Sequence, residues 1–411
     1  MIIRYVVMAK ILISFLGTGR VDRNKSKRCY ETTTYKIGNV SGDYTFMAKM
    51  LAEKENVDTV FLIGTRHSMW EEVYNSFSKG EVNEEMLLEM INDCDGANSK
   101  SSLDFPFRKY IEDASTDTVL KILLVHYGVD ELEIKKNIEI VLSIVDYLKD
   151  GDEIIVDITH SFRSIPLIIM NLLFYLRTIK NPKVTISHIY YGMLEVNREL
   201  GYTPVVDLKS ALSITDWTLG AYSFQEFGIS KQICTLVEDK SVTGSLGRFS
   251  SLLSLNYLGP LQQEAQRLSS LKNHKYTSLL ESMTVNPVVD DFVKIFGKET
   301  CPYKFQYKLA RWQFEKFNYL ASMTTLLEAT ITYACVVNNL HWQNKEERER
   351  CKKMLQNNDI NNDFKIENSL TTIYRAINKK RNNLVHQTGQ ANSSADEYVK
   401  AIHCCPEKFL P

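Results

Sequence analysis

The feature that most constrains the fold is a polar cluster, Asp157-Ile158-Thr159-His160-Ser161-Phe162-Arg163, that lies between two apolar segments. Residues 153–156 before it predict a buried parallel strand, and residues 166–176 after it predict a helix. The N-terminus of a helix offers free backbone N–H groups and a partial positive charge, to which Arg163 adds a fixed charge. A strand-to-helix junction of this composition therefore predicts an anion-binding site in an α/β fold.

The chain up to about residue 208 alternates apolar strands with amphipathic helices. The predicted strands are 11–16, 59–63, 119–125, 153–156 and 184–191, and the predicted helices are 43–55, 68–78, 131–149 and 163–178. Residues 28–37 are rich in Thr and Tyr and predict a hairpin, and Ser41 or Asp43 is expected to cap the helix that follows. This alternation predicts a Rossmann-like, mostly parallel sheet that is covered by helices on both faces.

Three short loops are expected to share one edge of that sheet, because ligands of parallel sheets bind beyond the carboxyl ends of the strands. They are Gly17-Thr18-Gly19, Gly64-Thr65-Arg66 and Thr159-His160-Ser161. The first loop is not a dinucleotide fingerprint, because Asp22 stands where the third glycine would be, and the chain has no Walker loop. A nucleotide-dependent enzyme is therefore disfavoured, while ordinary strand-ending turns stay an alternative to a ligand site.

After residue 212 the pattern becomes helical, which predicts two domains, 1–212 and 213–411. Helices are expected at 213–227, 247–258, 260–272, 307–339, 344–357 and 366–388, with 305–340 as the longest helical run. Residues 273–303 are less regular and are expected to include loops. The predicted fold class is thus α/β followed by an all-α domain.

The composition is that of an ordinary globular protein, and the protein has no overall positive charge that would attract nucleic acid. The net charge is −1, so any binding of nucleic acid must come from local patches such as residues 20–28 and 379–381. The eight cysteines form no Cys-x-x-Cys pair, which indicates reduced thiols in the cytoplasm and no zinc site. Residues 1–8 are too short for a signal, no run approaches a transmembrane length, and Met8 is a possible functional start.

A second polar group, Arg381-Asn382-x-x-x-His386, lies near the end of the predicted helical domain. On a helix Asn382 and His386 share one face, whereas Arg381 is about 140° away from His386 and must swing toward it. One copy offers a single His and a single Arg, but two copies around a two-fold axis would offer two of each.

These side chains suit RNA cleavage without a metal. A histidine can move a proton while the RNA 2′-hydroxyl attacks its own phosphate, and an arginine can stabilise charge on that phosphate. The reaction would leave a 2′,3′-cyclic end, and the sequence near Arg381 has no cluster of carboxylates for a two-metal site. The alternative interpretation is a charged helix end that is capped by His386.

Together the two halves resemble the CRISPR-associated type III accessory ribonucleases built from a CARF and a HEPN domain. Asp157-Ile158-Thr159-His160 resembles the DxTH motif of CARF domains, and residues 11–19 resemble their first strand and ligand loop. Arg381-Asn382-x-x-x-His386 resembles the HEPN motif. Ser161 departs from the pattern, since many relatives carry Gly there. The resemblance implies that the ligand is bound by Gly17, Thr18, Gly19, Thr65, Thr159, His160, Ser161 and Arg163.

The resemblance also implies partners and an activity. A homodimer or an oligomer of dimers would bind a cyclic oligoadenylate, most often cyclic tetra-adenylate, as an activator, with no other cofactor and no metal. Binding would activate a cytoplasmic endoribonuclease that cleaves single-stranded RNA with Arg381, Asn382 and His386, without membrane association. Two alternatives stay open: a non-catalytic sensor of the ring, and a ring nuclease that degrades its activator in the CARF pocket.

Overall fold

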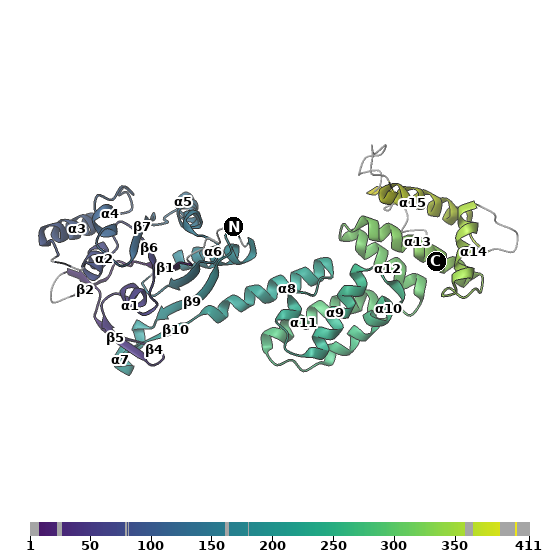
Figure 1. Ribbon diagram of the computed structural model, residues 1–411, viewed down its shortest axis with the longest axis horizontal. Coiled ribbons are helices and arrows are strands. Elements are labelled where there is room, and N and C mark those ends of the chain that lie inside the picture. Colours follow the sequence, from purple (N-terminus) through teal and green to yellow (C-terminus); the bar gives the residue numbers. More distant parts are fainter. Residues whose placement is uncertain are drawn as a thin grey trace, which may run out of the picture. The chain divides into compact units, whose positions relative to one another are not determined.

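The computed structural model describes residues 8–22, 27–78, 80, 82–160, 164–179, 181–357, 365–386 and 399–400. The chain divides into two compact units, Met1–Ser213 and Ile214–Pro411 (Figure 1). The first unit holds a mixed sheet with helices, and the described part of the second unit contains helices and no strand. This confirms the predicted fold class of an α/β domain followed by an all-α domain.

The first unit is built on an eight-stranded sheet in the order β5-β4-β10-β9-β8-β1-β6-β7. The strands are β1 Lys10–Phe15, β4 Thr33–Ile37, β5 Val40–Tyr44, β6 Thr59–Gly64, β7 Val119–Leu124, β8 Glu153–Asp157, β9 Thr185–Gly192 and β10 Thr203–Asp207. The pairs from β7 to β9 are all parallel, as is β10 with β4, whereas β9–β10 and β4–β5 are antiparallel. The sheet is therefore mostly parallel, as the sequence predicts.

Side chains of β1 alternate between two hydrophobic cores, because successive residues of a strand point to opposite faces. Leu12 lies in the core under helices α1 Met47–Lys54, α2 Trp70–Phe77, α3 Glu84–Gly96 and α4 Arg108–Glu112. Ile11 and Ile13 lie in the other core, under α5 Glu131–Leu142 and α6 Ile165–Ile179. The sheet is thus covered on both faces, and its strand ends stay available at the edges.

Two local predictions in the first unit are wrong. Residues 28–37 do not form one hairpin, because β3 Lys27–Cys29 pairs with β2 Arg20–Asp22, and β4 pairs with β5 instead. The turn between β4 and β5 uses Gly38 with a φ of +56°, a conformation that favours glycine. Ser41 and Asp43 therefore lie in β5, and α1 begins only at Met47, without a side-chain cap.

The second unit consists of helices that pack around two further cores. The longer helices are α8 Ser213–Phe227, α9 Lys240–Ser254, α10 Leu258–Arg267, α11 Leu279–Phe292, α12 Pro302–Glu315, α13 Tyr319–Val337, α14 Lys345–Asn357 and α15 Asn368–His386. The predicted run 305–340 is divided between α12 and α13, because Phe317 adopts a φ of +60° that ends the first helix. Residues 273–303, predicted to be less regular and to include loops, contain loops and also helix α11.

Helix α13 qualifies the prediction that no run reaches a transmembrane length. Its 19 residues are long and apolar enough to cross a membrane, with a mean hydropathy of 1.4. However, 61% of that apolar window is buried inside the protein, and the helix packs against α12, α14 and α15. The central helix of a folded core has the same composition, so α13 gives only weak support for a membrane span.

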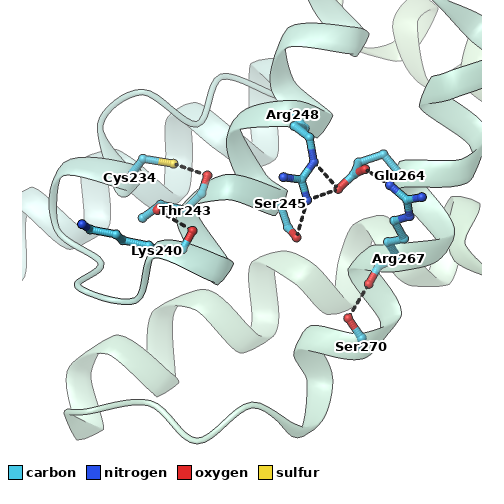
Figure 2. A network of polar contacts seen from close by, with 8 residues as sticks. All are labelled: Cys234, Lys240, Thr243, Ser245, Arg248, Glu264, Arg267 and Ser270. Carbon is cyan, nitrogen blue, oxygen red and sulfur yellow. Dashed lines mark hydrogen bonds and ion pairs between the residues drawn. The ribbon is translucent and has the colours of Figure 1, made fainter.

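Figure 2 shows a polar network between α9 and α10 in which one buried carboxylate accepts hydrogen bonds from two arginines. Glu264 is 2% exposed and accepts hydrogen bonds from the Arg248 guanidinium at 3.2 and 3.3 Å and from Arg267 Nη1 at 3.2 Å. Both arginine side chains are largely exposed to water. The arginines therefore compensate a buried charge while remaining solvated themselves.

The network predicts an asymmetric response to mutation. The double variant Arg248→Ala/Arg267→Ala should lower the free energy of unfolding by about 3 kcal/mol, because it leaves Glu264 buried without its charged partners. Adding Glu264→Leu should restore most of that loss, since the uncompensated carboxylate is then gone. Urea unfolding of the three proteins measures both effects, and a further loss on adding Glu264→Leu would contradict this explanation.

Candidate ligand-binding cavity

A cavity of about 250 Å³ opens beside the carboxyl ends of β1 and β8 in the first unit. Its lining residues are Gly17, Thr18, Gly19, Cys29, Tyr30, Glu31, Thr33, Thr159, His160, Leu194 and Asn197. Five of the eight predicted ligand residues are in this set, namely Gly17, Thr18, Gly19, Thr159 and His160. The structure therefore brings the first and third predicted loops together around one space.

Asp157, the last residue of β8, fixes the loop that carries Thr159. Its carboxylate is fully buried and accepts hydrogen bonds from Ser14 Oγ at 2.7 Å and from the Thr159 backbone N–H at 2.9 Å. Burial raises the pKa of Asp157, and the bonds from Thr159 and Ser14 oppose that rise. Thr159 Oγ1 in turn accepts a bond from the Gly192 backbone N–H at 2.8 Å. The carboxylate thus links β8 directly to β1, and through Thr159 it is linked to β9.

Two glycines are needed for the shape of the first loop. A Cβ atom on Gly17 would lie 3.0 Å from the carbonyl oxygen of His160, so a side chain there would push the two loops apart. Gly19 has a φ of +69°, and its Cβ would lie 2.8 Å from Met69 Sδ. The Gly-Thr-Gly sequence is therefore explained by close approach at Gly17 and by backbone conformation at Gly19.

His160 contributes an aromatic surface to the cavity. Its ring stacks on Tyr30 with centroids 4.3 Å apart and an interplanar angle of 22°, and Phe46 lies at 6.0 Å. The Tyr35 hydroxyl is 3.5 Å from His160 Nε2. Burial lowers the pKa of His160 to about 4, so the imidazole is neutral at physiological pH. The ring can stack and form hydrogen bonds, but it brings no cation for a phosphate.

The lowered pKa of His160 predicts that stability falls in mild acid. Between the unfolded pKa of 6.5 and the folded value of about 4, the unfolded chain binds more protons, so the free energy of unfolding decreases as the pH falls. From pH 7 to pH 5 we expect a loss of about 1–2 kcal/mol through this group, allowing for the partial exposure of the ring.

Urea unfolding of the parent and of His160→Phe at both pH values measures this contribution. The variant keeps an aromatic ring against Tyr30 but cannot bind the proton, so its loss between pH 7 and pH 5 should be smaller than that of the parent. Equal losses in the two proteins would contradict the assignment to His160.

Thr65, another predicted ligand residue, lies away from the cavity. Thr65 follows β6 but is 1% exposed and does not line the cavity; its backbone N–H donates to Ser68 Oγ at 3.0 Å. It serves the turn that leads into α2. Ser161 and Arg163 lie outside the described residues. The second predicted loop therefore supports the site indirectly, through the turn between β6 and α2.

Two tyrosines of the cavity region, Tyr30 and Tyr35, were not predicted as site residues. The Tyr30 hydroxyl accepts a hydrogen bond from the Gly17 N–H at 2.9 Å and donates one to the Gly17 carbonyl oxygen at 3.1 Å. Both backbone groups of Gly17, in the first loop, are therefore bonded to Tyr30. Tyr35 is fully buried behind His160. The available signal was the Thr- and Tyr-rich composition of residues 28–37, which the prediction used only to propose a hairpin.

Arg381, Asn382 and His386 lie on α15 of the second unit, as predicted. Arg381 is half-buried; its Nη2 donates to Asn378 Oδ1 at 3.2 Å, and its Nε is buried without a partner in the described structure. Asn382 is half-buried, and His386 is the last residue of the helix. Among the described side chains, no group of three or more His, Cys, Asp or Glu could hold a metal ion.

Comparisons with known proteins give the context of this geometry. Residues 11–195 match the family model of the CARF domain of the CRISPR system endoribonuclease Csx1, and residues 213–304 match that of the second domain of CRISPR-associated protein MJ1674. The chain is 33% identical over 397 residues to CRISPR-associated protein MJ1674 of Methanocaldococcus jannaschii. That alignment covers 92% of this chain and 62% of the relative, so the chain spans less than two thirds of the archaeal protein.

A solved structure is also similar over most of the chain. It is Enterococcus italicus Csm6 bound to cyclic hexa-2′-fluoro-hexa-dAMP, with 11% sequence identity and a TM-score of 0.32. The match covers 96% of this chain and 91% of the solved chain.

Proposed function

We propose that this chain is a ribonuclease activated by a cyclic oligoadenylate, on the basis of the match of residues 11–195 to a CARF-domain model and of the similarity to a CRISPR-associated protein. The observation that carries the proposal is the cavity at the ends of β1 and β8, which gathers Gly17, Thr18, Thr159 and His160 and whose lining, apart from Asn197, belongs to the CARF-matching residues. The proposed activator is cyclic tetra-adenylate, with the hexa-adenylate ring as the second candidate.

The chemistry of the cavity suits a nucleotide. The neutral His160 ring and Tyr30 offer aromatic surface for bases, and Thr18 offers a backbone N–H group and a hydroxyl for phosphates. A fixed positive charge has to come from outside this set, and we propose Arg163, which precedes α6 in the sequence, as the residue that supplies it. The pKa of His160, about 4, makes it a weak base at neutral pH, which disfavours a ring nuclease that depends on this imidazole.

The proposed catalytic residues are Arg381, Asn382 and His386, acting in a homodimer. Leu384 and Val385, on the same helix, are exposed at 43% and 49%, and an apolar surface next to the polar group is what a second copy would cover. Two copies would place two arginines and two histidines around one scissile phosphate of single-stranded RNA. The proposed reaction needs no metal, leaves a 2′,3′-cyclic phosphate and takes place in the cytoplasm.

Activation then follows from linkage. A ring can favour the active arrangement only by as much as it binds that arrangement more tightly than the resting one. A shift from 1% to 99% active protein needs a preference of about 10⁴-fold. A substitution that shifts the balance between the resting and the active arrangement should therefore change both the affinity for the ring and the rate of RNA cleavage.

Calorimetric titration with cyclic tetra-adenylate, cyclic hexa-adenylate and linear tetra-adenylate tests the ligand part of the proposal. We expect one of the rings to bind the parent more tightly than the linear form does. The Gly19→Ala substitution should lower the affinity for that ring. Gly38→Ala is the matched control, because Gly38 also has a positive φ but its Cβ would meet nothing within 4 Å. No binding of either ring to the parent, or an equal effect of both glycine variants, would contradict the proposed site.

A second candidate function is a sensor without nuclease activity. The observation that favours it is the state of Arg381, whose guanidinium is partly buried and bonded to Asn378. In that case the helical unit would serve for pairing or for contact with another protein. Tight ring binding without RNA cleavage by the full chain would support the sensor and exclude the ribonuclease.

A further inference from the structure

A second cavity of about 180 Å³ lies in the first unit between β3, α2 and α3, and we name it the Arg28–Glu71 cavity. It shares Cys29 with the ligand-binding cavity, so the two spaces adjoin the same strand. The volume is several times the share of one liquid water, which is about 30 Å³. The space is therefore large enough for a small organic group.

One wall of this cavity is a nearly buried arginine whose contacts reach the ligand loop. Arg28 is 10% exposed, and its Nε donates to Asp95 Oδ1 at 2.5 Å. Its Nη1 donates to the carbonyl oxygen of Thr18 at 3.3 Å and to that of His67. Its Nη2 is buried and has no hydrogen-bond partner in the described structure. One nitrogen of the guanidinium, with its two N–H groups, thus remains available, while the other two nitrogens are bonded.

A buried carboxylate on the same cavity supplies the complementary atom. Glu71, in the first turn of α2, is 8% exposed, and its Oε2 is buried without a hydrogen-bond partner in the described structure. Burial raises the pKa of Glu71 to about 7, so about half of the Glu71 side chains carry a carboxylate at neutral pH. Buried polar atoms of native proteins are nearly always paired. The cavity therefore holds one unused donor and one unused acceptor.

We propose that the Arg28–Glu71 cavity binds an adenine-type base by its amino edge. Adenine carries an amino donor next to a ring-nitrogen acceptor, and the two would bond to Glu71 Oε2 and Arg28 Nη2 respectively. The apolar side chains of Met69, Leu87 and Ile91 line the same space and suit the faces of a flat heterocycle. The base comes either from the bound ring, which rests on the proposed function, or from a free adenine nucleoside.

A base bound in the Arg28–Glu71 cavity would affect the ligand-binding cavity. A base that bonds to Arg28 Nη2 orders the same guanidinium whose Nη1 holds the Thr18 carbonyl, and Thr18 lines the ligand-binding cavity. Met69 lines the second cavity and lies against Gly19 of the same loop. The loop 17–19 is therefore in contact with both sites, which makes it the element through which one site affects the other.

The test is a calorimetric titration of the full chain with adenosine, with purine riboside, which lacks the amino group, and with cyclic tetra-adenylate. The variants are Glu71→Gln, which keeps the shape but removes the carboxylate, and Leu87→Phe, which fills the cavity without changing a polar atom. Glu84→Gln is the matched control, because Glu84 is exposed at the start of α3 and does not line the cavity. Melting curves confirm that each variant is folded.

We expect Glu71→Gln to lower the affinity for adenosine at least tenfold and Leu87→Phe to abolish adenosine binding. Glu84→Gln should leave the affinity for adenosine unchanged. Purine riboside should bind the parent at least tenfold more weakly than adenosine. Displacement of adenosine by the ring, with the ring also weakened in Glu71→Gln, assigns the base to the ring. Adenosine binding that persists in the presence of saturating ring assigns the site to a free nucleoside.

Two results would overturn the inference. The first is no adenosine binding together with a ring affinity that is the same within twofold in the parent, Glu71→Gln and Leu87→Phe, which means that the cavity holds only water. The second is adenosine binding whose affinity is unchanged by Glu71→Gln and by Leu87→Phe. By contrast, Glu71-dependent adenosine binding by a protein that binds neither ring would contradict the proposed function and support this inference.

Discussion

Arg381→Ala should reduce ring-activated RNA cleavage by about a thousandfold while leaving the affinity for the ring unchanged. The proposed role of Arg381 is to stabilise charge that develops on the scissile phosphate, and loss of one such donor typically costs 10²–10³ in rate. The affinity should not change, because Arg381 belongs to the second unit and the ligand-binding cavity to the first. Initial rates with a fluorogenic RNA, together with ring titration, measure the two quantities separately.

Lys379→Ala is the matched control for this prediction. Lys379 is an exposed cation on the same helix and two positions away, so its removal changes the local charge equally without touching the proposed catalytic group. We expect its effect on the cleavage rate to be less than tenfold. Similar losses in the two variants would mean that α15 contributes only a basic surface, and that the assignment of Arg381 as a catalytic residue is wrong.

Asp157→Ala should lower the free energy of unfolding by about 2–4 kcal/mol and weaken ring binding by about a hundredfold. The substitution leaves the Ser14 hydroxyl and the Thr159 N–H without their acceptor inside a fully buried site, and each unsatisfied group costs about 1–3 kcal/mol. Ring binding falls because Thr159 lines the cavity and loses the group that orients its loop. Urea unfolding and ring titration of the variant measure these effects.

A double-mutant cycle with Ser14→Ala controls for indirect effects. In the parent, Ser14→Ala removes one bond to Asp157, whereas in Asp157→Ala the serine has no carboxylate to donate to. The cost of Ser14→Ala should therefore be clearly smaller in the double variant than in the parent. Independent, additive costs would show that the 2.7 Å contact between Ser14 and Asp157 does not stabilise the cavity.

Much of the fold could be predicted from local patterns. Apolar runs that end in Gly or Asp identified β1, β6 and β8, since buried parallel strands are short and continuously apolar. Gly17 and Thr159 were predicted to meet because parallel strands end at one edge of a sheet, and both line the cavity. These inferences depend only on residues that are close together in the sequence.

The errors come from long-range pairing and from helix ends without a sequence signal. Tyr35 was missed because it reaches His160 only after β4 has paired with β10, far away in the sequence. The break at Phe317 was missed because no Gly or Pro marks it. Residues 273–303 were predicted to be less regular, yet helix α11 forms there and continues through Pro287. Thr65 was misplaced because the residue after a strand can face the following turn instead of the ligand.

The central claim is that a cyclic oligoadenylate in the cavity of the first unit activates RNA cleavage by the second. The most direct measurement is the cleavage of a fluorogenic RNA by the full chain in EDTA, as the concentration of cyclic tetra-adenylate or hexa-adenylate is raised from zero. We predict no cleavage without a ring and loss of activity in His386→Ala. One ring should activate cleavage, with half-maximal activation at the dissociation constant measured for that ring. Cleavage that is independent of the rings, or that survives His386→Ala, would contradict it.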